Sequence, residues 1–186
     1  MKRAARRSTH TTKLNADAQQ DWESEGWLCA AVEELGGDVA AHFRTERLII
    51  AGHGESQTMD TKVACQKLLG NLSRRNLGAT HMWTHNSWTH VMSDHEMISY
   101  IVPLTPETTL VRTKWLVHAD AVEGVDYDLT KLTEVWIATN AQNASLVAIN
   151  HRGARDPGYI PGPDSPSTEN YVDQCRPVRR LVCRPV

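Results

Sequence analysis

The stretch Thr108–His118, TTLVRTKWLVH, decides the fold class of this chain. Its residues alternate between two sets. One set is apolar apart from a single threonine, and the other carries the charged side chains. The first set is Val111, Thr113, Trp115 and Val117, and the second is Leu110, Arg112, Lys114, Leu116 and His118. Because successive side chains of a β-strand point to opposite faces, the stretch predicts a strand with one packed, apolar face.

The sequence before this strand has the same character. From His81 the chain runs through HMWTH, SWTHVMSDH and EMISYIVPL, which are rich in aromatic and β-branched residues, and the turn Thr105-Pro106-Glu107-Thr108 follows. Such runs separated by turn residues predict antiparallel hairpins. A further strand is expected around Arg47–Ala51, and a helix over residues 15–35 that stops at Gly36-Gly37.

A sheet with one apolar face needs a covering layer, and a long helix after the last strand can supply it. Residues Tyr127 to Asn150 show the steps of three and four that are typical of an amphipathic helix. The stripe consists of Leu132, Trp136, Thr139, Asn143, Leu146 and Asn150. We therefore expect an α+β fold with the helix packed on the sheet, and Asn143 on that stripe is either a hydrogen-bonded core amide or part of a site.

Charge and cysteine content exclude several classes of function. The formal net charge of -2 combines basic ends with an acidic body, since residues 1–14 and 175–186 carry nine basic side chains and no acid. An acidic body is a poor nucleic-acid surface. No apolar run is long enough for a membrane span, and no signal peptide is evident. The widely spaced Cys29, Cys65, Cys175 and Cys183 form no metal-binding pair, so we expect free thiols and a cytoplasmic protein.

Four histidines that lie close together, His81, His85, His90 and His95, raise the question of a metal site. Residues five apart on a strand face opposite sides, so these side chains converge only if Asn86-Ser87 and Ser93-Asp94 form turns. Histidines hydrogen-bonded at a sheet edge are the alternative. No nucleophile-elbow, P-loop or dinucleotide-binding pattern is present, and Ser145 and Cys65 have no neighbouring signature of a nucleophile.

A longer set of motifs resembles a known family. From Gln57 to Asp173 the chain contains QTMDTK, then NSWTHVMSDHEMISYIVPLTPETTLVRTKWLVHADAVEGVDYDLTKLTEVWIATNAQNASLV, then GYIPGPDSPSTEN. These segments resemble the C-terminal catalytic domain of Rieske-type, ring-hydroxylating oxygenase alpha subunits. The branch that uses glycine betaine, carnitine, choline or stachydrine is the most similar, and the TKWLVH and TNAQN motifs carry that likeness.

The resemblance implies a helix-grip, START-like domain over residues 15–173, in which a twisted antiparallel sheet packs on a long C-terminal helix. Residues 1–14 are expected to be a basic, disordered start and 174–186 a basic, irregular tail. The family uses mononuclear Fe(II) and a [2Fe–2S] cluster, works with a reductase and forms homo-oligomers. Its activity is hydroxylation and N-demethylation of a quaternary amine.

The departures from the family pattern concern its cofactors. The cluster-binding motifs and the stretch with both iron histidines do not occur in this sequence, and the family's carboxylate iron ligand corresponds to Asn143. A neutral amide is a weaker iron ligand than a carboxylate. We therefore expect a truncated fragment that binds neither cofactor and is inactive alone, and leave open whether it is an enzyme.

The alternative is a non-catalytic ligand-binding or interaction module that uses a cavity between sheet and helix. Trp83, Trp88, Trp115 and Trp136 could line that cavity and stack on a quaternary ammonium, or they could be core aromatics.

Overall fold

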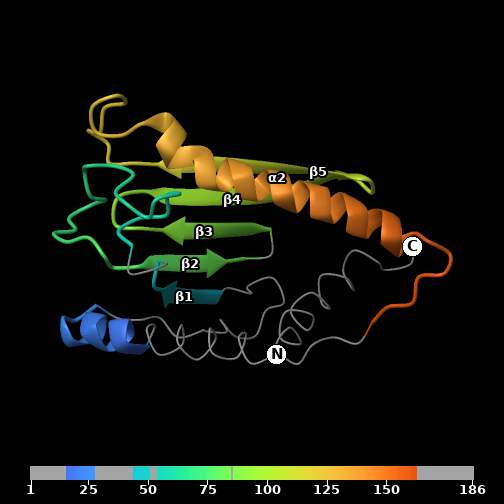
Figure 1. Ribbon diagram of the computed structural model, residues 1–186, viewed down its shortest axis with the longest axis horizontal. Helices are drawn as coiled ribbons and strands as arrows, with labels where there is room; N and C mark the ends of the chain where they lie inside the picture. The colour runs from blue at the N-terminus through green and yellow to red at the C-terminus, as the bar shows by residue number, and fades with distance from the viewer. Residues whose placement is uncertain (1–15, 28–43, 51–53, 85, 163–186) are drawn as a thin grey trace. The chain divides into compact units, whose positions relative to one another are not determined.

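The structure of the chain, a computed structural model, describes residues 16–27, 44–50, 54–84 and 86–162. A helix over residues 16–24 comes first. It is followed by five strands and a second helix: β1 (Arg44–Leu48), β2 (Ala79–Trp83), β3 (Ser87–Val91), β4 (Glu96–Thr105), β5 (Thr108–Leu116) and α2 (Leu129–Ala154). The strands form one antiparallel sheet in the order β1-β2-β3-β4-β5 (Figure 1). The expected α+β class, an antiparallel sheet with a long C-terminal helix, is confirmed.

The chain divides into two compact units. The first holds the helix over residues 16–24, the whole sheet and the start of α2 up to Val135, and the second begins within α2 at Trp136. Leu132 and Trp136 are buried, whereas residues 141–150 are exposed. That the distal part of α2 packs on the sheet stays a prediction.

Strand β5 has the predicted alternation over Arg112–Leu116, whereas its first residues are all exposed, Val111 of the predicted packed face among them. Thr113 and Trp115 are half-buried, while Arg112, Lys114 and Leu116 between and beside them are exposed. Thr113 and Trp115 lie opposite Ser99 and Met97 of β4, both of which are fully buried. The packed face inferred from the sequence therefore continues from β5 onto β4.

Three element boundaries differ from the predictions. The first helix ends at Ser24 rather than at residue 35, because the backbone turns at Gly26, whose φ is +85°, and Trp27 N–H donates to the Trp22 carbonyl oxygen. Residues 28–43 lie outside the described residues. Strand β1 covers 44–48 instead of Arg47–Ala51, and α2 starts at Leu129 because Asp128 Oδ1 accepts a hydrogen bond from Lys131 N–H at 2.8 Å.

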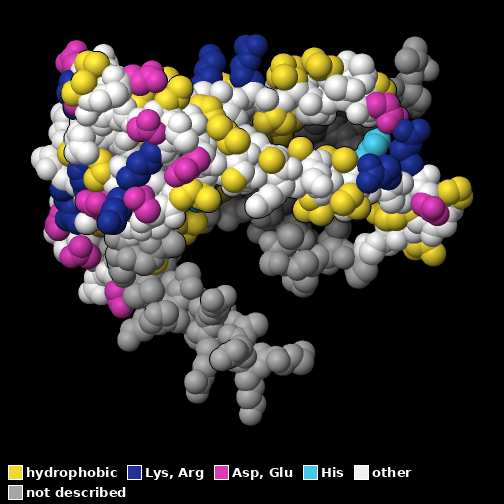
Figure 2. All heavy atoms as spheres, turned by 45° about the horizontal axis from the view of Figure 1, so that its top comes forward, with side chains coloured by type: hydrophobic (Ala, Val, Ile, Leu, Met, Phe, Trp, Pro, Cys, Tyr) yellow, Lys and Arg dark blue, Asp and Glu magenta, His cyan; other side chains and the backbone are white. Residues whose placement is uncertain are grey.

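The expectations for the basic ends, residues 1–14 and 174–186, lie outside the described residues, as do Cys29, Cys175 and Cys183. Cys65 is a free, buried thiol. Neither helix in the described ranges combines the length and hydrophobicity needed to cross a membrane. On the face that Figure 2 presents, acidic and basic side chains are interspersed with hydrophobic ones.

Candidate functional site on the aromatic face of the sheet

One face of the sheet gathers aromatic side chains from three strands. Residues directly opposite each other on neighbouring strands project to the same face. His81 and Trp83 of β2 lie opposite His90 and Trp88 of β3, and these lie opposite Met97 and Ser99 of β4, which in turn lie opposite Trp115 and Thr113 of β5. We call this set the aromatic face: His81, Trp83, Trp88, His90, Met97, Ser99, Thr113 and Trp115.

The β2–β3 hairpin brings the first four of these residues together. Its turn is closed by Thr84 N–H, which donates to the Ser87 carbonyl oxygen at 2.9 Å. The rings of His81 and His90 stack with centroids 3.9 Å apart and an interplanar angle of 23°. His81 also meets Trp83 edge-on, with centroids 5.5 Å apart and an angle of 79°. The hairpin thus presents a continuous aromatic surface.

His90 is neutral on this surface. It is 8% exposed, and burial together with the neighbouring His81 lowers its pKa to about 3. The Gln57 side-chain amide nitrogen lies 3.3 Å from His90 Nδ1. Because an amide NH₂ can only donate, Nδ1 accepts, and the proton of the neutral imidazole is on Nε2.

The loop that carries Gln57 is anchored by Asp94 in the β3–β4 turn. Ser56 Oγ donates to Asp94 Oδ1 at 2.7 Å, and the backbone N–H groups of Ala64 and Cys65 donate to Oδ2 at 2.8 and 3.1 Å. Arg75 adds an ion pair to Oδ2 at 3.9 Å. One buried carboxylate therefore fixes both ends of the loop 56–65 next to the aromatic face.

The balance of these interactions keeps Asp94 ionised. Burial raises the pKa of the Asp94 carboxyl, but the hydrogen bond and charge interaction with His95, and the hydrogen bonds from Ser56 and the Cys65 backbone, outweigh it and lower the pKa overall. Ser56, Asp94 and His95 do not form a catalytic triad. Ser56 Oγ and His95 Nδ1 share the same carboxylate oxygen, at 2.7 and 3.0 Å, and all three side chains are inaccessible to solvent.

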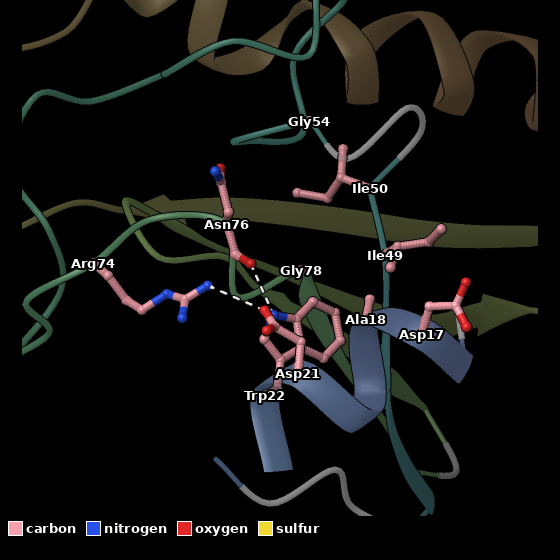
Figure 3. A pocket seen from close by; sticks show the side chains of 10 residues that line it. All are labelled: Asp17, Ala18, Asp21, Trp22, Ile49, Ile50, Gly54, Arg74, Asn76 and Gly78. Carbon is pink, nitrogen blue, oxygen red and sulfur yellow. Dashed lines mark hydrogen bonds and ion pairs between the residues drawn. The ribbon is translucent and has the colours of Figure 1, made fainter. Parts of the chain in front are cut away.

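A separate cavity of about 350 Å³ lies in the first unit and shares no residue with the aromatic face (Figure 3). Its lining combines apolar side chains with charged groups at the rim: Asp17, Ala18, Asp21, Trp22, Ile49, Ile50, Gly54, Arg74, Asn76 and Gly78. Trp22 Nε1 donates to the Asn76 carbonyl oxygen at 2.9 Å, and Arg74 pairs with Asp21 at 3.9 Å. Residues 51–53, between the lining residues Ile50 and Gly54, lie outside the described residues, so no ligand is assigned to this cavity.

The sequence left open whether turns at Asn86-Ser87 and Ser93-Asp94 bring histidines together. The chain turns between β2 and β3 and again between β3 and β4, and the histidines that pair are His81 and His90, while His95 belongs to the Asp94 anchor. His85 lies outside the described residues. If residues are paired outward from the turn, 83 falls opposite 88 and 81 opposite 90. This pairing could have predicted the contact between His81 and His90 from the sequence. Among the residues that the structure describes, no group of three His, Cys, Asp or Glu side chains could hold a metal ion.

Asn143, which the sequence resemblance matches to the family's carboxylate ligand, lies exposed on α2 within the second unit. Its surroundings in the helix, TNAQNASLV, contain no histidine, cysteine or carboxylate. A single neutral amide does not fit the two-histidine, one-carboxylate set that non-heme iron requires. Of the four tryptophans that the sequence left as either cavity lining or core aromatics, Trp83, Trp88 and Trp115 share one face in the first unit, and Trp136 belongs to the second.

Comparison with known proteins identifies the class. The family model "Ring hydroxylating alpha subunit (catalytic domain)" matches residues 8–180, so the chain belongs to the family of ring-hydroxylating oxygenase alpha subunits. The sequence resemblance to that family is thereby confirmed.

Three similar proteins within this class share a name. The glycine betaine monooxygenase oxygenase subunit of Pseudomonas aeruginosa strain UCBPP-PA14 is 45% identical over 155 residues, which are 81% of this chain and 36% of that protein. The subunits of the same name from P. aeruginosa strain PAO1 and from Chromohalobacter salexigens are each 45% identical over 123 residues, which are 63% of this chain and 29% and 28% of those proteins. The chain spans about a third of the length of these relatives.

Proposed function

We propose that this chain is the substrate-binding part of an oxygenase alpha subunit whose whole protein hydroxylates and N-demethylates a small quaternary amine of the glycine betaine type. The observation that supports the proposal most is the aromatic face, in which Trp83 and Trp88 lie directly opposite each other on neighbouring strands. The names of the relatives supply the substrate class. The whole protein would work with a reductase and as a homo-oligomer in the cytoplasm, as the family does.

The aromatic face suits a quaternary ammonium for a physical reason. Such a group has no N–H to donate and so forms no N–H hydrogen bond with carboxylates or carbonyl oxygens, whereas the electron-rich faces of indole rings attract it. The ring of His90, which stacks on that of His81 and is neutral, adds aromatic surface without adding a repelling positive charge. The described side chains of this face thus attract the cation through their rings alone.

The family's iron and [2Fe–2S] cluster supply the oxygen and electron chemistry of the whole protein. The lack of a histidine or carboxylate beside Asn143 supports the proposal that this chain holds no iron by itself, and the cluster-binding motifs do not occur in its sequence. We therefore propose that the chain by itself binds the amine without turning it over.

Calorimetry with glycine betaine, carnitine and stachydrine tests the proposal. We expect saturable binding of at least one of them, and at least a fivefold loss of affinity when Trp83 and Trp88 are both replaced by leucine, because two cation–aromatic contacts are removed. Trp27→Leu is the matched control, since Trp27 packs against a separate core cluster with Trp22. Absence of binding by all three amines would overturn the proposal.

A non-catalytic binding or interaction module is the second candidate, because the aromatic face can hold a ligand whether or not chemistry follows. The two candidates differ in what the whole protein does. Oxygen-dependent release of formaldehyde from glycine betaine by this chain, with iron bound 1:1, would favour a complete enzyme over both a binding module and an inactive fragment.

A further inference from the structure

The indole nitrogen of Trp115 is a buried hydrogen-bond donor with no acceptor among the described residues. An indole N–H can only donate, and leaving it buried without an acceptor costs free energy. Buried donors of this kind in native proteins call for an explanation, such as a ligand or an ordered water. Trp115 is also on the aromatic face, at the β5 end of the row that begins with His81.

The polar atoms around Trp115 are occupied by one another. The hydroxyl oxygens of Ser99 and Thr113 lie 2.8 Å apart, and Ser99 Oγ donates to Met97 Sδ at 3.3 Å. With one hydrogen per hydroxyl, Ser99 donates to the sulfur and Thr113 donates to Ser99. These hydrogen bonds join the three neighbours to one another, and among the described residues the indole N–H has no acceptor.

We propose that the Trp115 indole N–H binds the carboxylate of a betaine whose quaternary ammonium lies against Trp83 and Trp88. This assignment rests on the proposed function and deepens it, since it names the residue that separates betaines from amines without a carboxylate. Trp115 is then the specificity-determining residue of the aromatic face.

The spacing of the sheet permits this arrangement. Trp88 on β3 and Trp115 on β5 are separated by two strand spacings across the sheet, roughly 10 Å. Trp88 is level with Thr113, so Trp115 lies two residues further along the strand, roughly 7 Å. Met97 and Ser99 of β4 fill the floor between them.

The charge of the face agrees with a zwitterion. Apart from the two histidines, the members of the aromatic face carry no ionisable group, and burial keeps His90 neutral; on β1, Arg44 and Glu46, one of each sign, lie opposite Trp83 and His81. A betaine has one positive and one negative group and no net charge. Its ammonium is held by rings and its carboxylate by a neutral donor, so neither group needs a counter-ion from the protein.

The test compares Trp115→Phe with the unchanged chain by calorimetry, using glycine betaine and tetramethylammonium as probes. Phenylalanine keeps the ring and removes the donor. We expect the affinity for glycine betaine to fall about tenfold or more, because a hydrogen bond to a charged group is lost, while tetramethylammonium binding changes less than about twofold. Trp27→Phe should change neither affinity.

A second measurement does not depend on the variant folding. In ¹H–¹⁵N NMR of the unchanged chain, the indole resonance of Trp115 should shift on adding glycine betaine and stay in place with tetramethylammonium. If glycine betaine binds but neither the Trp115 resonance nor the Trp115→Phe affinity responds, the inference is wrong while the proposed function stands. If neither probe binds to the unchanged chain, the proposed function fails and the role of Trp115 fails with it.

Discussion

Asp94 is the residue on which the order around the aromatic face depends. Its two carboxylate oxygens receive hydrogen bonds from Ser56, His95 and the backbone of Ala64 and Cys65, and it is fully buried. A buried charge with this many donors is stabilising only as a complete set, since each donor left without its acceptor costs free energy.

Replacing Asp94 with asparagine should therefore be costly. The amide keeps the shape but removes the charge and turns one acceptor into a donor that faces N–H groups. We expect the free energy of unfolding, measured by urea denaturation, to fall by about 2–4 kcal/mol. Asp120→Asn is the control, because that side chain is 83% exposed, and its loss should be below about 0.5 kcal/mol.

The same substitution predicts a pH dependence. The pKa of Asp94 is lowered in the folded protein, so its contribution is present above the unfolded carboxyl value of about 4 and is lost as the pH falls through the lower folded value. The stability difference between the unchanged chain and Asp94→Asn should shrink below about pH 4. A difference that stays constant from pH 3 to pH 7 would contradict the role given to the ionised carboxylate.

At the scale of elements, the strands and α2 could be predicted because their signals are local. The alternation in TTLVRTKWLVH and the three-and-four spacing from Leu132 to Asn150 depend on neighbours in sequence. The loop 56–65 could not be predicted, because its order comes from Asp94, which is 38 residues beyond Ser56. For the site, tryptophans 83, 88 and 115 were named from the sequence, but Gln57 and the Asp94 anchor depend on pairings that no local pattern records.

Gly78, just before β2, lies where β1 and the first helix come close, so we expect it to tolerate no larger residue. Its φ is +67°, and a Cβ there would collide with the Leu48 carbonyl oxygen and lie 2.7 Å from Cη2 of Trp22. Gly78→Ala should therefore lower the free energy of unfolding by about 3 kcal/mol or more, through backbone strain and displacement of β1 and the first helix.

Gly70 is the matched control for this prediction. Its φ is +55°, but a Cβ there would meet nothing within 4 Å. Gly70→Ala should cost only about 1–2 kcal/mol, the strain of a left-handed backbone conformation. Equal losses in the two variants, followed by urea denaturation with tryptophan fluorescence, would show that crowding at Gly78 contributes nothing.

At the scale of the whole molecule, the aromatic face is complete within the first unit, whereas Asn143 belongs to the second. The chain also spans only about a third of the relatives' length. If the proposed function holds, binding of an amine by the aromatic face is separable from iron chemistry, because Asn143 has no histidine or carboxylate beside it in TNAQNASLV. This separation makes the iron site testable without any assay of turnover.

Restoring the family's carboxylate with Asn143→Asp should not create an iron site. Non-heme iron of this class needs two histidines and one carboxylate, and one restored carboxylate provides a single ligand. We expect anaerobic Fe(II) titration calorimetry to show no stoichiometric tight binding by the unchanged chain, by Asn143→Asp, or by the control Asn150→Asp, which adds the same charge two helical turns along α2. Tight 1:1 binding by Asn143→Asp alone would show that two histidines of this chain complete the site, and the proposal that the chain cannot turn over its ligand would have to be abandoned.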